Sequence, residues 1–371
     1  MKKVIIAPDS FKGALTAGEA TDIIATTVRE FFSDCKIVKM PIADGGEGSV
    51  DAVLSAIGGE VVKVEVQSPD NRIITATYGI SDNGTAVIEM AQSSGITRQM
   101  GLNPMTSNTY GFGQLILDAL ARDVRAFTLC IGGSATTDGG TGMASALGVR
   151  FSDKLGSTYV PCGETLCDIA AVDVKDIDER VAGCSFTVMC DVDNPLYGEN
   201  GAAYVYGPQK GANPEQVQIL DAGLRHYEAI LFNQFGQNYN ETPGAGAAGG
   251  LGAGCMAFLG AKLMSGIDAI LKLCEFEKHL DGADLIITGE GKLDSQSFYG
   301  KVLSGIKRDA QGVPVWSICG VCECDVTLLH EHGITVFETS EGVGAEESIS
   351  DAAKHLRQTA RRAMQKAKEM G

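Results

Sequence analysis

The loop at residues 132–140 has the composition of a phosphate-binding loop. It combines four glycines with three hydroxyl side chains and one carboxylate. Glycines let the backbone approach an anion closely, hydroxyls add donors, and the amides at the start of a following helix carry a partial positive charge. A glycine-rich turn without a ligand is the alternative, and the density of polar groups disfavours it. The sequence therefore predicts phosphate contacts from Gly133, Ser134, Thr136, Thr137 and Asp138.

A second glycine-rich stretch at residues 243–252 contains a literal G-x-G-x-x-G, from Gly244 to Gly249. A dinucleotide fingerprint needs a strand that delivers its first glycine, and the preceding residues 234–242 are polar and rich in asparagine. Two interpretations stay open: an anion-binding helix N-terminus that includes Gly246, Gly249 and Gly250, or small residues that let helices pack closely. A Walker A motif is absent from the chain.

Carboxylates follow two apolar runs that are typical of buried strands. Asp191 comes directly after residues 186–190, and Asp294 ends the loop 288–294, which also contains Glu290. Carboxylates at strand ends suit a general base for a hydroxyl group, or ligands for Mg²⁺.

Near the start of the chain, Ser10 and Lys12 lie in a loop between a predicted strand and a predicted helix. Lys12 opposes the preference of a helix N-terminus for acidic residues, which favours a ligand-binding role over a plain surface position. Asp44 and Glu47 have the spacing of a helix-capping box, so capping is the strong alternative to a binding role for them.

The cysteines and histidines give little support to metal or nucleophilic chemistry. The chain has eleven cysteines, several in apolar runs, so we expect free thiols rather than disulfides. Cys319, Cys322 and Cys324 precede two histidines, but without a second thiol pair a zinc site is disfavoured. All five histidines lie in helical or connecting stretches, where a catalytic partner for a nucleophile is not evident.

Strands and helices alternate at both ends of the chain, which predicts a parallel sheet. The middle differs, because residues 73–78 and 85–90 are Thr-rich, alternate in polarity and flank Asp82-Asn83-Gly84, a good hairpin turn. We therefore predict two α/β domains. Residues 1–74 and 284–371 would form a discontinuous Rossmann-like domain with a parallel sheet, and residues 75–283 an inserted domain with a mixed sheet.

Composition restricts the partners. The 371 residues include 47 acidic and 30 basic side chains, which gives a formal charge of −17. Nucleic acid and anionic membranes are disfavoured as partners. The first apolar run has four residues, too few for a signal-peptide core or a membrane span, so we expect a cytoplasmic protein. The sequence leaves a homo-oligomer open.

Five blocks, at residues 8–13, 44–48, 132–140, 244–252 and 288–294, together resemble the signature blocks of the bacterial glycerate kinase family, type 1. They occur in the family's order and span most of the chain. The resemblance implies two α/β domains with the active site in the cleft. It also implies ATP-dependent phosphorylation of D-glycerate to 2-phosphoglycerate, with the 3-phospho isomer as the less favoured product.

The residue roles are hypotheses built on the chemistry of phosphoryl transfer, which needs positioning, charge neutralisation and a carboxylate near the attacking hydroxyl. Ser10 and Lys12 would hold the glycerate carboxylate or the transferring phosphoryl group. The two glycine-rich loops would bind the polyphosphate of ATP. Asp44 and Glu47 would bind the substrate. Asp191 or Asp294 would act as the general base. Glu290 and Asp294 would bind Mg²⁺.

Two other functions stay open at this point. A non-catalytic protein that binds small anions would share the donor loops, although such proteins usually carry an export signal. A nicotinamide-dependent hydroxyacid dehydrogenase would share the substrate class, but it needs a strand before Gly244.

Overall fold

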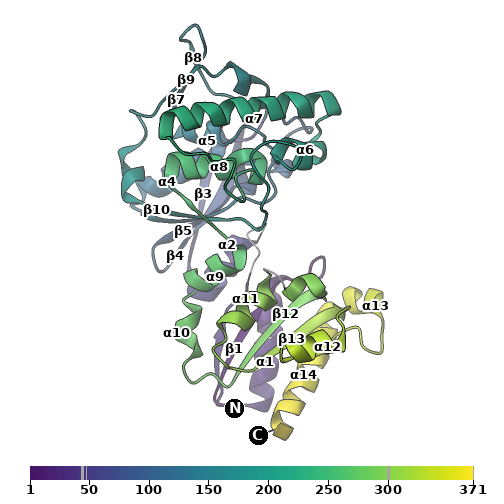
Figure 1. Ribbon diagram of the computed structural model, residues 1–371. Helices are drawn as coiled ribbons and strands as arrows, with labels where there is room; N and C mark the ends of the chain where they lie inside the picture. Colours follow the sequence, from purple (N-terminus) through teal and green to yellow (C-terminus); the bar gives the residue numbers. More distant parts are fainter. Residues whose placement is uncertain (43–45, 47, 299–300, 371) are drawn as a thin grey trace. The chain divides into compact units, whose positions relative to one another are not determined.

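The computed structural model describes residues 1–42, 46, 48–298 and 301–370 (Figure 1). The chain forms two compact α/β units. The first unit comprises residues 1–44, 51–58 and 265–371, and the second comprises residues 45–50 and 59–264. The predicted fold class is confirmed: one unit has a parallel sheet built from both ends of the chain, and the other has a mixed sheet.

The first unit is built on a five-stranded sheet in the order β14-β13-β12-β1-β2, in which all neighbouring strands are parallel. The apolar run of β1 is buried, as expected for a strand covered on both faces. Pro8 at the end of β1 lies opposite Gly289 of β12, and β12 continues beyond that pair to Leu293. The strands are β1 (Lys3–Pro8), β2 (Lys36–Lys39), β12 (Leu285–Leu293), β13 (Val315–Cys322) and β14 (Ile334–Glu338).

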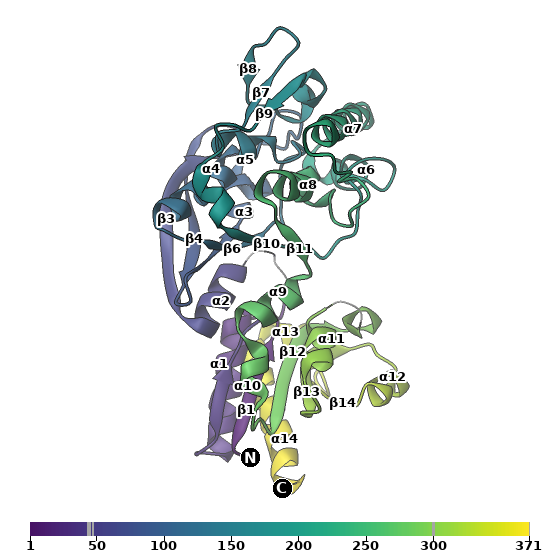
Figure 2. The same ribbon diagram turned by 60° about the vertical axis from the view of Figure 1, so that its left-hand side comes forward.

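Helices from distant parts of the sequence cover this sheet. A capping box starts α1, since Glu19 donates its amide to the Thr16 hydroxyl and its carboxylate accepts the Thr16 amide. α1 and α14, from opposite ends of the chain, pack together in one apolar cluster (Figure 2). The helices are α1 (Ala17–Phe31), α2 (Ser49–Ile57), α9 (Gly266–Leu273), α10 (Phe276–Leu280), α11 (Val302–Asp309), α12 (Val326–Glu331), α13 (Ala345–Ser350) and α14 (Ala352–Met370), with the 3₁₀ turn η5 (Ser295–Phe298).

The second unit has a six-stranded sheet in the order β11-β10-β6-β5-β4-β3. β3 and β4 are antiparallel, and the predicted hairpin joins β4 to β5. The pairs β5–β6, β6–β10 and β10–β11 are parallel. The strands are β3 (Gly59–Gln67), β4 (Ile73–Ser81), β5 (Thr85–Glu89), β6 (Ala126–Cys130), β10 (Ser185–Met189) and β11 (Lys262–Met264).

Helices and a small second sheet complete this unit. α4, α7 and α8 supply many of its buried apolar residues. The small sheet, in the order β8-β7-β9, was not predicted. The helices are α3 (Ala91–Ser94), α4 (Tyr110–Ala121), α5 (Thr141–Ala146), α6 (Ala202–Tyr206), α7 (Pro214–Phe235) and α8 (Ala247–Leu259); the 3₁₀ turns are η1 (Ile96–Arg98), η2 (Gly163–Asp168), η3 (Glu179–Gly183) and η4 (Pro208–Lys210); the short strands are β7 (Arg150–Ser152), β8 (Thr158–Tyr159) and β9 (Ala171–Asp173).

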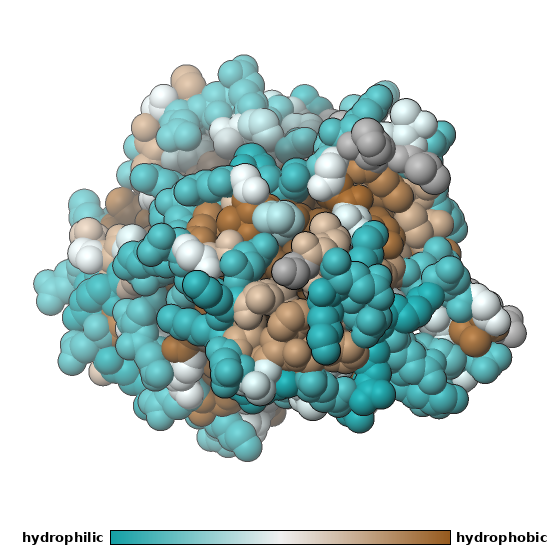
Figure 3. Space-filling view, turned by 90° about the horizontal axis from the view of Figure 1, so that it is seen from below, coloured by the Kyte–Doolittle hydropathy of each residue, from teal (hydrophilic) through white to brown (hydrophobic). Residues whose placement is uncertain are grey.

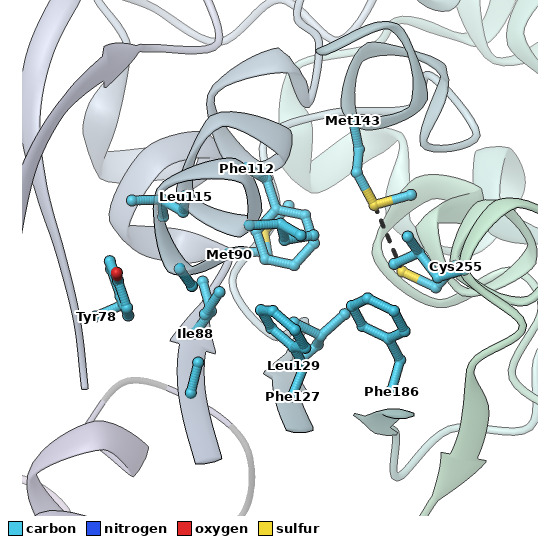
Figure 4. Packing of buried hydrophobic residues seen from close by; sticks show 14 of the residues in the cluster. Tyr78, Ile88, Met90, Phe112, Leu115, Phe127, Leu129, Met143, Phe186 and Cys255 are labelled. Atoms are coloured by element: carbon cyan, nitrogen blue, oxygen red, sulfur yellow. Dashed lines mark hydrogen bonds between the residues drawn. The ribbon is translucent and has the colours of Figure 1, made fainter. Parts of the chain in front are cut away.

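The core of the second unit lies between its main sheet and these helices. Phe127 of β6 stacks on Phe186 of β10 with ring centroids 4.7 Å apart, and Met143 of α5 meets Cys255 of α8 (Figure 4). One face of the molecule shows hydrophilic side chains around a hydrophobic area (Figure 3). None of the helices in the described part of the chain is both long and apolar enough to cross a membrane.

The unit boundaries differ from the predicted positions after residues 74 and 283. β3, which was not predicted, pairs along its whole length with β4 and therefore belongs to the second unit. Residues 265–283 belong to the first unit, where Ile267 of α9 packs against Gly305 of α11. The second difference arises from contacts between segments distant in sequence, whereas β3 and β4 are neighbours along the chain.

Candidate functional site

The carboxyl ends of three parallel strands in the second unit bring candidate residues to one edge of its sheet. Glu89 of β5 lies opposite Cys130 of β6, which in turn lies opposite Met189 of β10. The glycine-rich loop starts two residues after β6, and Asp191 starts the loop two residues after β10. In open α/β sheets ligands bind at this edge. The sheet therefore brings the predicted phosphate loop and one predicted general base close together.

Asp138 organises the inner part of the loop 132–140. Its carboxylate is fully buried and accepts hydrogen bonds from the Thr109 amide (2.8 Å), the Thr109 hydroxyl (2.7 Å) and the amides of Gly140 and Gly142 (3.2 and 3.1 Å). Burial raises the pKa of Asp138, and these donors oppose the shift. In the described conformation Asp138 fixes the turn into α5 rather than facing outward.

The loop has an outer edge and a buried inner side. Gly132 and Gly133 are exposed, and their amides have no acceptor among the described residues. Ser134 is 5% exposed, whereas Thr136 and Thr137 are fully buried. The two outer glycines are thus the exposed part of the loop, and anion binding by their amides stays a prediction. Side-chain contacts of the two threonines with phosphate stay a prediction.

The glycines of the second glycine-rich stretch pack closely against neighbouring backbone. The backbone is left-handed at Ala248, Gly249 and Gly250, with φ of 54°, 72° and 89°. A Cβ on Gly249 would lie 2.0 Å from the Thr136 carbonyl oxygen, and one on Gly246 would lie 2.1 Å from the Pro195 carbonyl oxygen. These glycines are therefore closely packed, but against loop backbone rather than between two helices, while phosphate contacts by Gly246, Gly249 and Gly250 stay a prediction. Residues 234–246 are all described and contain no strand, so the Rossmann context is absent there.

Lys210, which the sequence reasoning missed, lies behind the loop. It ends η4, its side chain is fully buried, and its Nζ donates to the Thr136 carbonyl oxygen (2.5 Å) and the Ser134 hydroxyl (3.1 Å). The Ser134 hydroxyl in turn lies 3.2 Å from the Ala248 carbonyl oxygen. Burial lowers the pKa of Lys210 to about 7, and the Asp138 carboxylate opposes the shift. The sequence signal that could have identified Lys210 was a single lysine in the turn Gly-Pro-Gln-Lys-Gly at residues 207–211.

Asp191 is exposed at the start of the loop after β10. This loop packs on the second glycine-rich stretch: the Gly246 amide donates to the Asn194 carbonyl (2.9 Å), and a Cβ on Gly244 would lie 3.1 Å from the Val192 carbonyl oxygen. Asp191 therefore has the exposure and the position at the sheet edge that a general base requires.

A second group of candidates lies at the carboxyl ends of β1 and β12 in the first unit. The Asp9 amide donates to the Gly289 carbonyl (2.8 Å), and a Cβ on Gly291 would lie 3.4 Å from the Lys12 amide nitrogen. The strand register therefore brings the loop 9–13, with Ser10 and Lys12, beside the last residues of β12, which continues past Gly289 to Leu293, so Glu290 lies in the strand and not in the predicted loop.

Glu290 is the most perturbed carboxyl group of this edge. Its carboxylate accepts a hydrogen bond from the Ser297 hydroxyl (3.1 Å), and the Ser297 hydroxyl accepts the Asp294 amide (3.3 Å). Burial raises the pKa of Glu290 to about 7; the charges of Asp9 and Asp294 add to the rise, while Ser297 and Lys301 oppose it. The structure thus brings the two predicted metal ligands, Glu290 and Asp294, within electrostatic reach of each other.

The donor set of this edge fits Mg²⁺ bound together with a phosphate ligand. Within the described residues, no three histidine, cysteine or carboxylate side chains converge on a metal position. Mg²⁺ usually takes only one or two carboxylates and completes its shell with waters and substrate phosphates. Two mutually repelling carboxylates, Glu290 and Asp294, meet that requirement. Asp44 and Glu47, predicted to bind substrate, lie outside the described residues.

Comparisons with known proteins agree with this architecture. Residues 4–368 match the model of the glycerate kinase family. A glycerate kinase from Halalkalibacterium halodurans is 44% identical over 339 residues, which cover 90% of this chain and 89% of the relative. A glycerate 2-kinase from Escherichia coli K12 is 41% identical over 92% of this chain and 91% of the relative.

A solved crystal structure from Salmonella typhimurium LT2, provisionally assigned as a glycerate kinase 2, has a TM-score of 0.90 and 38% sequence identity. The match covers 99% of this chain and 98% of that one. Family model, relatives and solved structure therefore agree over nearly the whole length: the chain belongs to the glycerate kinase family and is an enzyme, a kinase.

Proposed function

We propose that this enzyme transfers the γ-phosphoryl group of ATP to the C2 hydroxyl of D-glycerate, giving ADP and 2-phosphoglycerate. The observation that carries the proposal is the outer edge of the loop 132–140, where the exposed amides of Gly132 and Gly133 lie in front of a buried lysine. Backbone donors with local positive charge are what a polyphosphate needs in a chain of net charge −17. The name of the Escherichia coli relative, glycerate 2-kinase, favours the 2-phosphate over the 3-phosphate.

The proposed mechanism uses positioning and electrostatics. Phosphoryl transfer calls for in-line alignment, neutralisation of developing charge, and a carboxylate that accepts the proton of the attacking hydroxyl. The loop 132–140 holds the phosphates of ATP, with Asp138 keeping its shape. Lys12 and Ser10 hold the glycerate carboxylate. Asp191 or Asp294 accepts the hydroxyl proton, which is the assignment that mutation must decide.

We also propose Mg²⁺ as the cofactor, with Glu290 and Asp294 as its protein ligands. When bound, the ion neutralises charge on the transferring phosphates. The Ser297 hydroxyl holds Glu290 in place and also meets the Asp294 amide, so one side chain orders both ligands. Burial, with a smaller contribution from the nearby carboxylates, raises the pKa of Glu290, so its anion is unfavourable there and a bound cation would stabilise it.

The test is a coupled assay of ADP release by the purified enzyme with ATP, Mg²⁺ and D-glycerate, followed by phosphorus NMR of the product. We expect turnover that requires both glycerate and Mg²⁺, and a phosphate on the secondary carbon. A phosphate on the terminal carbon would replace the 2-kinase reaction by the 3-kinase reaction. Absence of ADP release with glycerate would overturn the substrate assignment.

A further inference from the structure

Lys210 has an environment that stability alone does not explain. A fully buried ammonium group is unfavourable unless charged partners compensate it. Lys210 forms no ion pair within the described residues, and its two hydrogen-bond acceptors, the Thr136 carbonyl and the Ser134 hydroxyl, are neutral. Buried ionisable groups with such perturbed environments concentrate at functional sites.

The contacts of Lys210 connect three segments that are far apart in the sequence. Its Nζ reaches Ser134 and Thr136, which are 76 and 74 residues away in the chain. Ser134 also contacts the carbonyl of Ala248, in the left-handed turn at residues 248–250. The ammonium group thus lies at the meeting point of η4, the loop 132–140 and that turn, on the buried side of the loop.

The loop needs such support because its outer edge has few anchors of its own. The Gly133 carbonyl accepts the Ile96 amide (3.1 Å), and the Ala135 amide donates to the Ser94 carbonyl (3.0 Å). The exposed amides of Gly132 and Gly133 can bind a ligand only while the backbone behind them keeps its conformation. Lys210 supplies both that anchor and a positive charge close to where an anion binds.

We propose that Lys210 is a positioning residue for the nucleotide: its buried ammonium group holds the inner side of the loop 132–140 so that the outer amides bind the phosphates of ATP. This inference rests on the proposed function, because it takes ATP as the anion at this loop. It assigns Lys210 no contact with the reacting atoms.

The test compares steady-state kinetics of the wild-type enzyme with those of Lys210→Met, which keeps the length of the side chain but removes the charge and the donors. Charge-assisted hydrogen bonds are strong when buried, so we expect the KM for ATP to rise at least tenfold. The KM for glycerate should stay within twofold of wild type. A KM for ATP within twofold of wild type, in a variant with native circular dichroism, would overturn the proposal.

A matched control and a second variant separate positioning from folding. Tyr78→Phe removes another buried side-chain hydrogen bond of the same unit, from Tyr78 to Asp118 (2.7 Å), and should lower Tm without moving the KM for ATP. Ser134→Ala removes one acceptor of Lys210 and should raise the KM for ATP about threefold. If Lys210→Met does not fold, the test rests on Ser134→Ala. An unchanged KM for ATP in Ser134→Ala then overturns the proposal.

Failure of the proposed function would be recognised separately. If wild-type enzyme releases no ADP with glycerate, the substrate assignment fails, and ATP affinity measured by calorimetry replaces KM. Weaker ATP binding by Lys210→Met than by wild type would still support the role of Lys210. Equal binding would overturn it.

Discussion

Gly249→Ala tests whether the left-handed turn at residues 248–250 supports the phosphate loop. Gly249 has φ of +72°, and an added Cβ would lie 2.0 Å from the Thr136 carbonyl oxygen and 2.7 Å from the Thr137 Cα. Left-handed backbone costs a non-glycine residue about 1–2 kcal/mol. The clash is with backbone rather than with a flexible side-chain end, so overpacking adds about 1–3 kcal/mol.

Gly260→Ala is the matched control, because Gly260 ends the same helix with φ of +61° and an added Cβ would meet nothing within 4 Å. It should show the backbone penalty alone. The difference between the two variants is then about 2 kcal/mol, which corresponds to roughly 4–8 °C in Tm for a unit of this size.

Thermal unfolding followed by circular dichroism measures both variants, and kinetics with ATP measure the effect on the loop. We expect Gly249→Ala to have the lower Tm and also a raised KM for ATP, because the new methyl group displaces Thr136. Equal Tm values for the two variants would refute the reasoning, because the clash of the added Cβ with the Thr136 backbone would then not lower the free energy of unfolding.

Three further predictions concern the proposed roles. Lys12→Ala should raise the KM for glycerate about tenfold, in line with loss of a charge-assisted hydrogen bond; unchanged kcat and KM would make Lys12 a surface residue. Asp191→Asn or Asp294→Asn, whichever removes the general base, should lower kcat on the order of 100-fold, and near-normal turnover in both would contradict the base assignment. Burial lowers the pKa of Lys210 to about 7, and the charge of Asp138 opposes this shift. Lys210 therefore loses its charge as the pH rises from 7 to 9, and the KM for ATP should increase over this range. If Lys210→Met shows the same increase, the titration of Lys210 is not its cause.

The two alternative functions fare differently. The non-catalytic binding protein is wrong, because the chain belongs to a family of enzymes. The dehydrogenase would share the substrate class, but it needs a strand before Gly244, and residues 234–246 contain none.

Local sequence patterns were sufficient for most of the secondary structure. The hairpin between β4 and β5 was predicted because it depends on residues close together in the chain. β3 was missed although the sequence contains its signal, because Val62, Val64 and Val66 alternate with charged residues and the partner strand β4 follows after a short turn. The strands of the small sheet have only two or three residues, too few for a recognisable alternation.

The sequence by itself determined which loops carry glycine, hydroxyl and carboxylate groups, and five of those loops in order identified the family. Only the tertiary structure decided which of these groups face outward. Thr136, Thr137 and Asp138 look like ligand contacts in the sequence, yet they are buried, and the turn at residues 248–250 packs on the backbone of Thr136 and Thr137. Lys210 looks like a surface residue, yet it lies behind the loop through contacts that span more than 70 residues. Burial and long-range hydrogen bonds follow from packing of distant segments, and no local pattern contains them.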